Sequence, residues 1–393
     1  GGREMANGEF VGARLTDSNF RRSILQCANL FGADLSDADL GGADLSRADL
    51  RGATFRRCNL EGANLHQADI RDGFIMRRDA NGNYSYDSRR SGAAEFDDAR
   101  MSGADLSSAK LARVFAPRTD MTRANLRNVN FREADLSGSD LSGVNLTGAD
   151  LTAANLSHCL LRGATLAGAL FDRTKLDGAD LTAANFDFGE MSHIDVSHAI
   201  LPRNLDSLDV SIQQVIIDHG KWIASMGREG KQANLERVDL QSWDAPGINM
   251  SAARLALTVL KKSNLQSGRF SMTDFSGALL TESNLRSADL RGAKLDKANL
   301  AGADLGDADC TSMPVSAGGM QTWPTRLREA NLSRADLRGA RLDGADLTLA
   351  DLQRADLRGA SLRGAVLMDA DLRGADLRGA NTKDADMRGA KGA

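Results

Sequence analysis

Residues 33–50 read ADLSDADLGGADLSRADL, so that Leu35, Leu40, Leu45 and Leu50 follow one another at a constant spacing of five. An alanine precedes each leucine by two positions, and an aspartate lies between them. The unit Ala-(Asp/Asn)-Leu-X-X, with glycine or alanine common at the last X, returns along nearly the whole chain. Such a repeat predicts the overall architecture more strongly than any local motif does, because each unit buries its apolar side chains against the neighbouring units.

A period of five fits neither a straight helix nor a straight strand. In an α-helix of about 100° per residue, every fifth side chain is rotated by about 140°, so the leucines would spread around the helix. In a strand, an odd period would turn successive leucines to opposite faces. A chain that turns once per repeat keeps all the leucines inside. The leucine and the small alanine then point inward, and the Asp/Asn and X positions point outward.

The octets ADLSDADL at 33–40 and RGADLRGA at 373–380 resemble the bacterial pentapeptide-repeat family. The resemblance extends over most of the chain. It implies an all-β protein, a right-handed quadrilateral β-helix with four pentapeptides in each coil. It implies no single activity, because members of the family have several unrelated roles.

The repeat register is interrupted three times. We expect about 16 coils, stacked at roughly 4.8 Å, in β-helix tracts at 1–70, 93–201, 233–310 and 327–393. Between them we expect a hairpin insert at 71–92, a helical insert at 202–232 and a loop insert at 311–326. Within the second tract Phe115 lies one residue off the inward position, so a distorted corner is expected at Ala116-Pro117.

The first insert has the pattern of a β-hairpin. Asn81-Gly82 is a strong turn signal between two short β-prone runs. Because Tyr and Arg are favoured in protein interfaces, this insert is the first candidate for binding another protein. The alternative is a solvated hairpin that covers a corner. The candidate residues are Arg77, Arg78, Tyr84, Tyr86, Arg89 and Arg90.

The second insert has helical periodicity over 206–227, with Asp206 or Ser207 as the N-cap and Gly227 at the end. We expect its apolar stripe to pack on a coil or to cap a block of coils. The alternative is a surface for a partner or a second copy, and the solenoid ends are also candidates for self-association. The third insert, with Pro314 and Trp323, is expected to be an ordered loop.

Composition excludes several classes of protein. The formal net charge of −4 gives no strongly basic field, which argues against direct nucleic-acid binding. No apolar run approaches the ~20 residues needed to cross a membrane, and no signal peptide is visible. The chain opens with Gly1-Gly2 instead of methionine, so we expect processed or trimmed ends.

The cysteines favour a reducing compartment, hence the cytoplasm. Cys58 and Cys159 occupy the inward alanine position and Cys310 occupies the leucine position, whereas Cys27 is expected to point outward. No CxxC pair is present. Buried thiols of this kind act as small apolar side chains.

No catalytic set stands out, and we predict that the protein is not an enzyme and needs no metal or organic cofactor. His193 and His198 are five apart and should diverge on adjacent faces of one coil. The numerous aspartates occupy the outward motif position, so the repeat itself explains them. Glycine-rich stretches lack the strand–loop–helix context of a phosphate-binding loop.

Two outward charge patterns remain. Acidic and basic residues should form neighbouring ladders near the end of the chain, where the twenty-residue spacing stacks Asp336, Asp356 and Asp376 beside Arg338, Arg358 and Arg378. The stretch 133–161 lacks Lys and Arg and is the best candidate for a negative face that binds a protein. Its candidate residues are Asp135, Asp140 and Asp150.

Two functions follow as hypotheses. The first is a non-enzymatic structural or protein–protein interaction scaffold with an unknown partner. The second comes from the family resemblance, because some members imitate DNA and protect bacterial DNA gyrase or topoisomerase. Such mimicry requires a continuous acidic face, since DNA carries one charge per about 1.7 Å of its axis. Arginines interrupt most of the faces expected here, which favours the scaffold.

Overall fold

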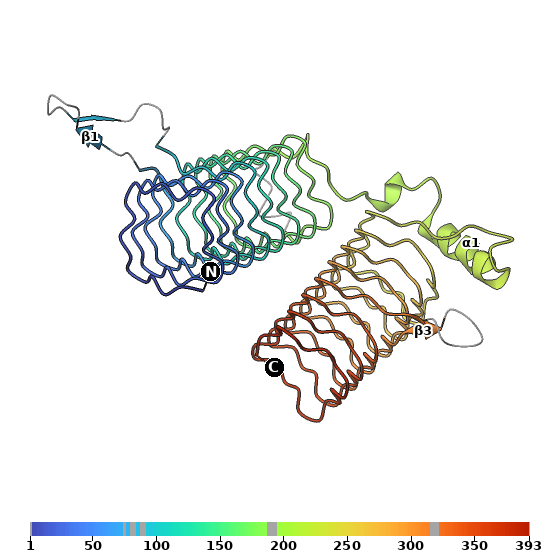
Figure 1. Cartoon of the computed structure of the whole chain (residues 1–393). Helices are drawn as coiled ribbons and strands as arrows, with labels where there is room; N and C mark the ends of the chain where they lie inside the picture. Colours follow the sequence, from blue (N-terminus) through green and yellow to red (C-terminus); the bar gives the residue numbers. More distant parts are fainter. Residues whose placement is uncertain are drawn as a thin grey trace. The chain divides into compact units, whose positions relative to one another are not determined.

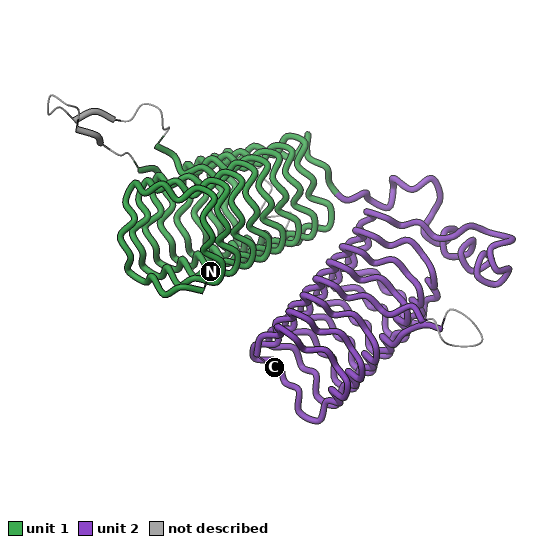
Figure 2. Tube along the Cα trace, in the orientation of Figure 1, with its two compact units in different colours: residues 1–201 green, residues 202–393 purple. Residues whose placement is uncertain are grey.

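The computed structural model describes residues 2–73, 76–78, 84–86, 92–186, 195–314 and 322–392. The chain forms two compact units, residues 1–201 and residues 202–393. Each unit is a stack of coils that the backbone climbs in four short sides (Figures 1 and 2). Every parallel bridge among the described residues joins two residues of the same unit.

One coil contains four pentapeptides, because parallel bridges join residues that are twenty apart, as in Asp39↔Asn59. Each side ends in a tight turn. The Ala43 backbone N–H donates to the Leu40 carbonyl over 2.9 Å, and the intervening Gly42 has a φ of 64°. Glycine adopts this left-handed conformation without strain, which explains its frequency at the last motif position.

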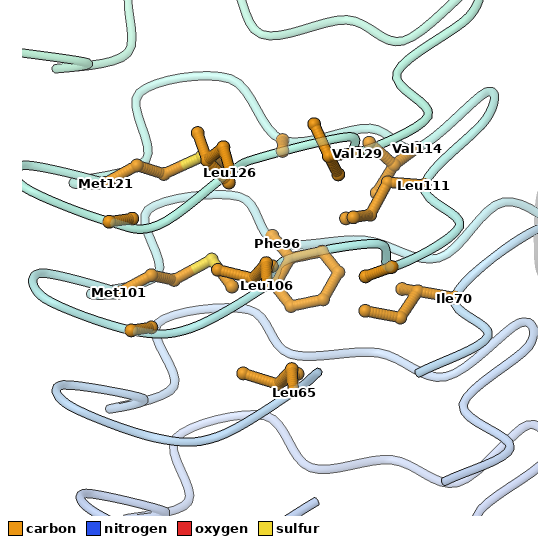
Figure 3. Packing of buried hydrophobic residues seen from close by; sticks show 14 of the residues in the cluster. Leu65, Ile70, Phe96, Met101, Leu106, Leu111, Val114, Met121, Leu126 and Val129 are labelled. Atoms are coloured by element: carbon orange, nitrogen blue, oxygen red, sulfur yellow. The ribbon is translucent and has the colours of Figure 1, made fainter. Parts of the chain in front are cut away.

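The interior consists of the predicted leucine and alanine ladders. Leu35, Leu40 and Leu45 are 0% exposed, and Ala43 is equally buried. In Figure 3, Met121 lies over Met101 and Leu126 over Leu106, one coil apart. The inward and outward assignment made from the five-residue period is therefore confirmed.

The coil stack continues across both inserts that carry strands. Thr54 pairs with Glu95, 41 positions away instead of 20, and the Gly73 N–H donates to the Gly92 carbonyl over 2.7 Å at the base of the first insert. There β1 (Met76–Arg78) pairs antiparallel with β2 (Tyr84–Tyr86) (Figure 1). In the second unit β3 (Met313–Pro314) pairs antiparallel with β4 (Thr322–Trp323).

The expected distortion at Ala116-Pro117 is absent. Phe115 occupies the outward bridge position between Glu95 and Asp135 and is 41% exposed. Ala116 takes the inward position, where it is fully buried. Pro117 then falls at the second position of a regular turn, where its fixed φ is favourable. The prediction of a distorted corner was wrong because the small Ala116 fills the inward position and Phe115 stays outward, so the turn needs no distortion.

The second unit begins with a helical segment. A 3₁₀ helix, η1 (Leu205–Ser207), is capped by Asn204, and α1 (Ile212–Ala224) is capped by Ser211, whose hydroxyl accepts from the Gln214 N–H over 3.2 Å. The helix is therefore shorter than predicted, because Leu208 is extended and separates the two helices. No helix of the described residues has the length and apolar character needed to cross a bilayer.

Candidate functional site

The predicted hairpin residues lie at the first insert. Arg77 and Arg78 belong to β1, and Tyr84 and Tyr86 belong to β2, with Arg78 opposite Tyr84 and Met76 opposite Tyr86 in the backbone register. The side chains of the two strands lie outside the described residues. Arg89 and Arg90 lie outside them altogether.

The three predicted acidic residues lie on three different sides of the first unit. Asp135 is in the bridge ladder with Phe115 and Asn155, and Asp140 is in the ladder with Asp120 and Leu160. Asp150 is in a third ladder, between Asn130 and Leu170. The structure therefore does not bring Asp135, Asp140 and Asp150 together into one negative face.

Each of these carboxylates accepts hydrogen bonds from other residues of the coil stack. Asp135 Oδ1 accepts from the Ser137 N–H over 3.0 Å and from Asn155 Nδ2 over 3.1 Å. Asp140 Oδ1 accepts from the Ser142 N–H over 2.9 Å. The outward Asp/Asn position thus holds the turn that follows it, a role typical of Asx side chains and one that the sequence analysis did not recognise.

Asp150 also forms an ion pair with a basic residue of the preceding coil. Its Oδ2 lies 3.2 Å from Arg132 Nη1, and its Oδ1 accepts from the Thr152 N–H over 3.0 Å. Partial burial opposes the charged carboxylate, but the bonds from Thr152 and the Arg132 guanidinium hold the pKa of Asp150 below its usual range. Asp150 is therefore charged but locally compensated.

The predicted ladder of opposite charges is confirmed in the second unit. Asp336, Asp356 and Asp376 are joined by successive parallel bridges. Each binds the arginine two residues later, with nitrogen–oxygen distances of 2.5, 2.6 and 2.6 Å. The Arg378 guanidinium lowers the pKa of Asp376 to about 2. Since each carboxylate has its own guanidinium, this side of the coil is not an acidic stripe.

The histidines that the structure describes do not gather with other potential metal ligands. His198 Nδ1 lies 3.2 Å from Asp177 Oδ1, and His193 lies outside the described residues. Within the described ranges, no group of three or more His, Cys, Asp or Glu side chains is arranged to hold a metal ion.

The four cysteines differ in their surroundings as predicted. Cys27 is exposed, whereas Cys58, Cys159 and Cys310 are buried and unpaired. Burial raises the pKa of Cys159 and Cys310 to about 12 and raises the pKa of Cys58 as well. These three thiols pack as small apolar side chains and carry no reactive thiolate at neutral pH.

Ellman's reagent should therefore titrate one of the four thiols in the native protein and all four in denaturant. The thiolate is the reacting species, and burial disfavours it in the other three cysteines. Cys27→Ser should abolish the rapid native reaction. Rapid modification of two or more thiols in the folded protein would contradict the burial described here.

The four-sided coil, the inward leucine and alanine ladders and the turn at every fifth residue define a β-helical solenoid. The family model described as Pentapeptide repeats matches segments that together cover residues 6–72, 99–201, 273–309 and 325–391. The chain therefore belongs to the pentapeptide-repeat family, whose members form right-handed β-helices.

Several solved pentapeptide-repeat structures are similar to this chain. HetL, involved in heterocyst differentiation regulation in the cyanobacterium Nostoc sp. strain PCC 7120, shares 24% identity over 91% of this chain and 88% of its own, with a TM-score of 0.24. Full-length QnrB1, a plasmid-mediated fluoroquinolone resistance protein, shares 18% identity over 50% of this chain and 86% of its own, with a TM-score of 0.34.

Rfr23 from the cyanobacterium Cyanothece 51142 shares 26% identity over 34% of this chain and 91% of its own, with a TM-score of 0.29. The search of curated proteins found no match.

Proposed function

We propose that the protein is a non-enzymatic scaffold that binds another protein, and that its inserts carry the recognition. The observation behind this proposal is that outward side chains of the coils bind one another. Asp135 and Asp140 hold backbone turns, and Asp336 and Asp356 are paired with arginines. Specific recognition is then more readily supplied by loops on the rigid coils than by the coils themselves.

The hairpin insert is the first candidate for the binding site. Its tyrosines and arginines are residue types that dominate binding energy in protein interfaces. Asp135, Asp140 and Asp150 are secondary candidates, each as a separate contact, because they lie on different sides of the unit. We further propose that the protein has about 16 coils, interrupted by a hairpin insert, a helical insert and a loop insert. We also propose that it resides in a reducing compartment such as the cytoplasm.

Imitation of DNA toward gyrase or topoisomerase is the weaker candidate. It would require unpaired carboxylates along one side, because DNA presents one charge per about 1.7 Å. Among the described residues, the longest run of bridged aspartates is Asp304, Asp336, Asp356 and Asp376, with one aspartate in each coil. The last three of them each bind an arginine. This arrangement supports the scaffold and not the mimic.

The proposal is tested by removing the hairpin insert. A short Gly-Ser link replacing residues 74–91 should leave the coils intact, because Gly73 and Gly92 are already joined at the base of the insert. A partner captured from a lysate of the source organism and identified by mass spectrometry should bind the wild type but not this variant. The melting temperature and circular-dichroism spectrum should stay nearly unchanged.

A matched variant with a similar link in place of residues 315–321 serves as the control. It should still bind if the hairpin insert carries recognition. If the 74–91 variant binds the partner at full strength, recognition lies on the coils or on another insert, and the proposed site is wrong.

A further inference from the structure

A buried histidine joins the helical insert to the coils of the second unit. His219 of α1 is 0% exposed. Its Nδ1 accepts a hydrogen bond from the Ala233 backbone N–H over 3.1 Å. Ala233 is 1% exposed and belongs to the inward alanine ladder of this unit. The histidine therefore connects the helix to the chain where the coils begin.

The helix covers the beginning of this core with its apolar side. Ile212, Val215 and Ile216 of α1, together with Leu208 before it, are partly buried against the core of the second unit. The chain then folds back along α1, and the Lys231 N–H donates to the Asp218 carbonyl over 3.1 Å. Besides this apolar packing, the helix is held by a few hydrogen bonds, and His219 is the side chain that accepts one of them.

The geometry assigns the proton of the neutral ring. Because Nδ1 accepts from a backbone N–H, the proton of a neutral imidazole is on Nε2. That Nε2 is buried and has no hydrogen-bond partner. The ring also stacks on Trp222, with the ring centres 5.7 Å apart and the planes 13° apart. The site therefore accommodates the neutral ring and satisfies only one of its nitrogens.

No counter-charge for a protonated ring is provided by the surrounding elements. Burial lowers the pKa of His219, and a smaller effect of the Ser251 backbone raises it. The charged residues near it in the helix and in the following chain and coils are not among the causes of this shift. They are Asp218, whose Oδ1 accepts from Gln214, Lys221, Lys231, and Arg254, which pairs with Glu236.

We propose that His219 is a pH-sensitive latch, which holds α1 on the first coil when the imidazole is neutral and releases it when the imidazole is protonated. Protonation transfers a proton from solvent to the Nδ1 lone pair and forms a positively charged imidazolium. Nδ1–H then faces the Ala233 N–H, and two donors cannot bond. The backbone of Ser251 offsets part of the desolvation of the buried charge, and no charged group is among the causes of the pKa shift. Release of α1 exposes its apolar side and the end of the core.

The direction of the effect follows from the lowered pKa. An unfolded or released histidine titrates near its ordinary value of 6.5, whereas the latched ring binds its proton at lower pH. The attachment is therefore complete above that ordinary value and weakens as the pH falls toward the lowered one. Within this window the equilibrium between latched and released helix shifts by up to about tenfold per pH unit.

Hydrogen–deuterium exchange on the full chain tests the latch. After correction for the intrinsic exchange rate, peptides spanning 212–233 should lose protection between pH 7.5 and pH 5, while peptides from coils 330–370 keep theirs. His219→Gln retains an acceptor for the Ala233 N–H but cannot be protonated in this range, so its protection should not depend on pH. His158→Gln changes a histidine of the first unit and should keep the wild-type pH response.

The ring nitrogens of the wild type provide a second test that does not require the variant to fold. Nitrogen NMR at pH 7.5 should show the proton of His219 on Nε2, and its pKa should lie below the ordinary value of 6.5. Equal protection of 212–233 at both pH values in the wild type would overturn the latch. So would a proton on Nδ1 at pH 7.5, or the same pH-dependent loss of protection in a folded His219→Gln variant.

Discussion

Replacing Leu141 with aspartate should lower the free energy of unfolding of the first unit by more than about 4 kcal/mol. Leu141 is 0% exposed, and burial of a leucine contributes about 1.5–3 kcal/mol. An unpaired carboxylate at this position adds the cost of its desolvation. Because coils are stabilised mainly by their neighbours, the loss should extend to the coils that contain Met121 and Leu161.

Ser142→Asp is the matched control, since it places the same carboxylate one residue away. Ser142 is partly exposed at a turn, so the change should stay within about 0.5 kcal/mol. Urea unfolding followed by circular dichroism measures both variants. Equal shifts in the two midpoints would show that the inward assignment of Leu141 is wrong.

Replacing Phe96 with alanine should cost about 3–5 kcal/mol, the usual loss for a large buried aromatic side chain. Phe96 is fully buried, and its ring stacks on Phe55 with 4.5 Å between the ring centres. These two residues lie on opposite sides of the hairpin insert in the sequence. The prediction therefore tests whether the core is continuous across that insert.

Phe115→Ala provides the control for Phe96→Ala. The two phenylalanines are on adjacent coils, and the Phe96 N–H donates to the Phe115 carbonyl over 2.8 Å. The Phe115 side chain points outward and is 41% exposed, so its loss should change stability by about 0.5 kcal/mol or less. Thermal unfolding measures the stability of both variants. A larger loss of stability for Phe115→Ala than for Phe96→Ala would show that Phe115, and not Phe96, points into the core.

The candidate site was less predictable than the core. The spacing of Asp135, Asp140 and Asp150 already contained a signal that the sequence analysis did not use. Within an uninterrupted tract, residues of successive coils stack on one side when they are twenty apart, whereas five or ten residues lead to another side of the coil. The ladder of Asp336, Asp356 and Asp376 was predicted because it has the twenty-residue spacing.

Local elements that interrupt the repeat were also difficult to place. The helical pattern over 206–227 did not distinguish η1 from α1, because both capping residues, Asn204 and Ser211, are common types that also occur in turns. At Phe115 the large apolar side chain suggested a distortion, but the register is regular, with Phe115 outward, Ala116 inward and Pro117 in the turn.

The sequence determined the four-sided solenoid and the identity of its buried residues. Because the chain turns once in each pentapeptide, the position of a residue in the repeat predicts whether its side chain points inward, as Leu40 does, or outward, as Asp39 does. Tertiary structure decided the contacts between coils and between the coils and α1. Arg132 meets Asp150, and His219 meets Ala233, only because folding brings separate turns and elements together. The five-residue period by itself does not specify these two contacts, which determine where the charge of Asp150 is compensated and where the helix is attached.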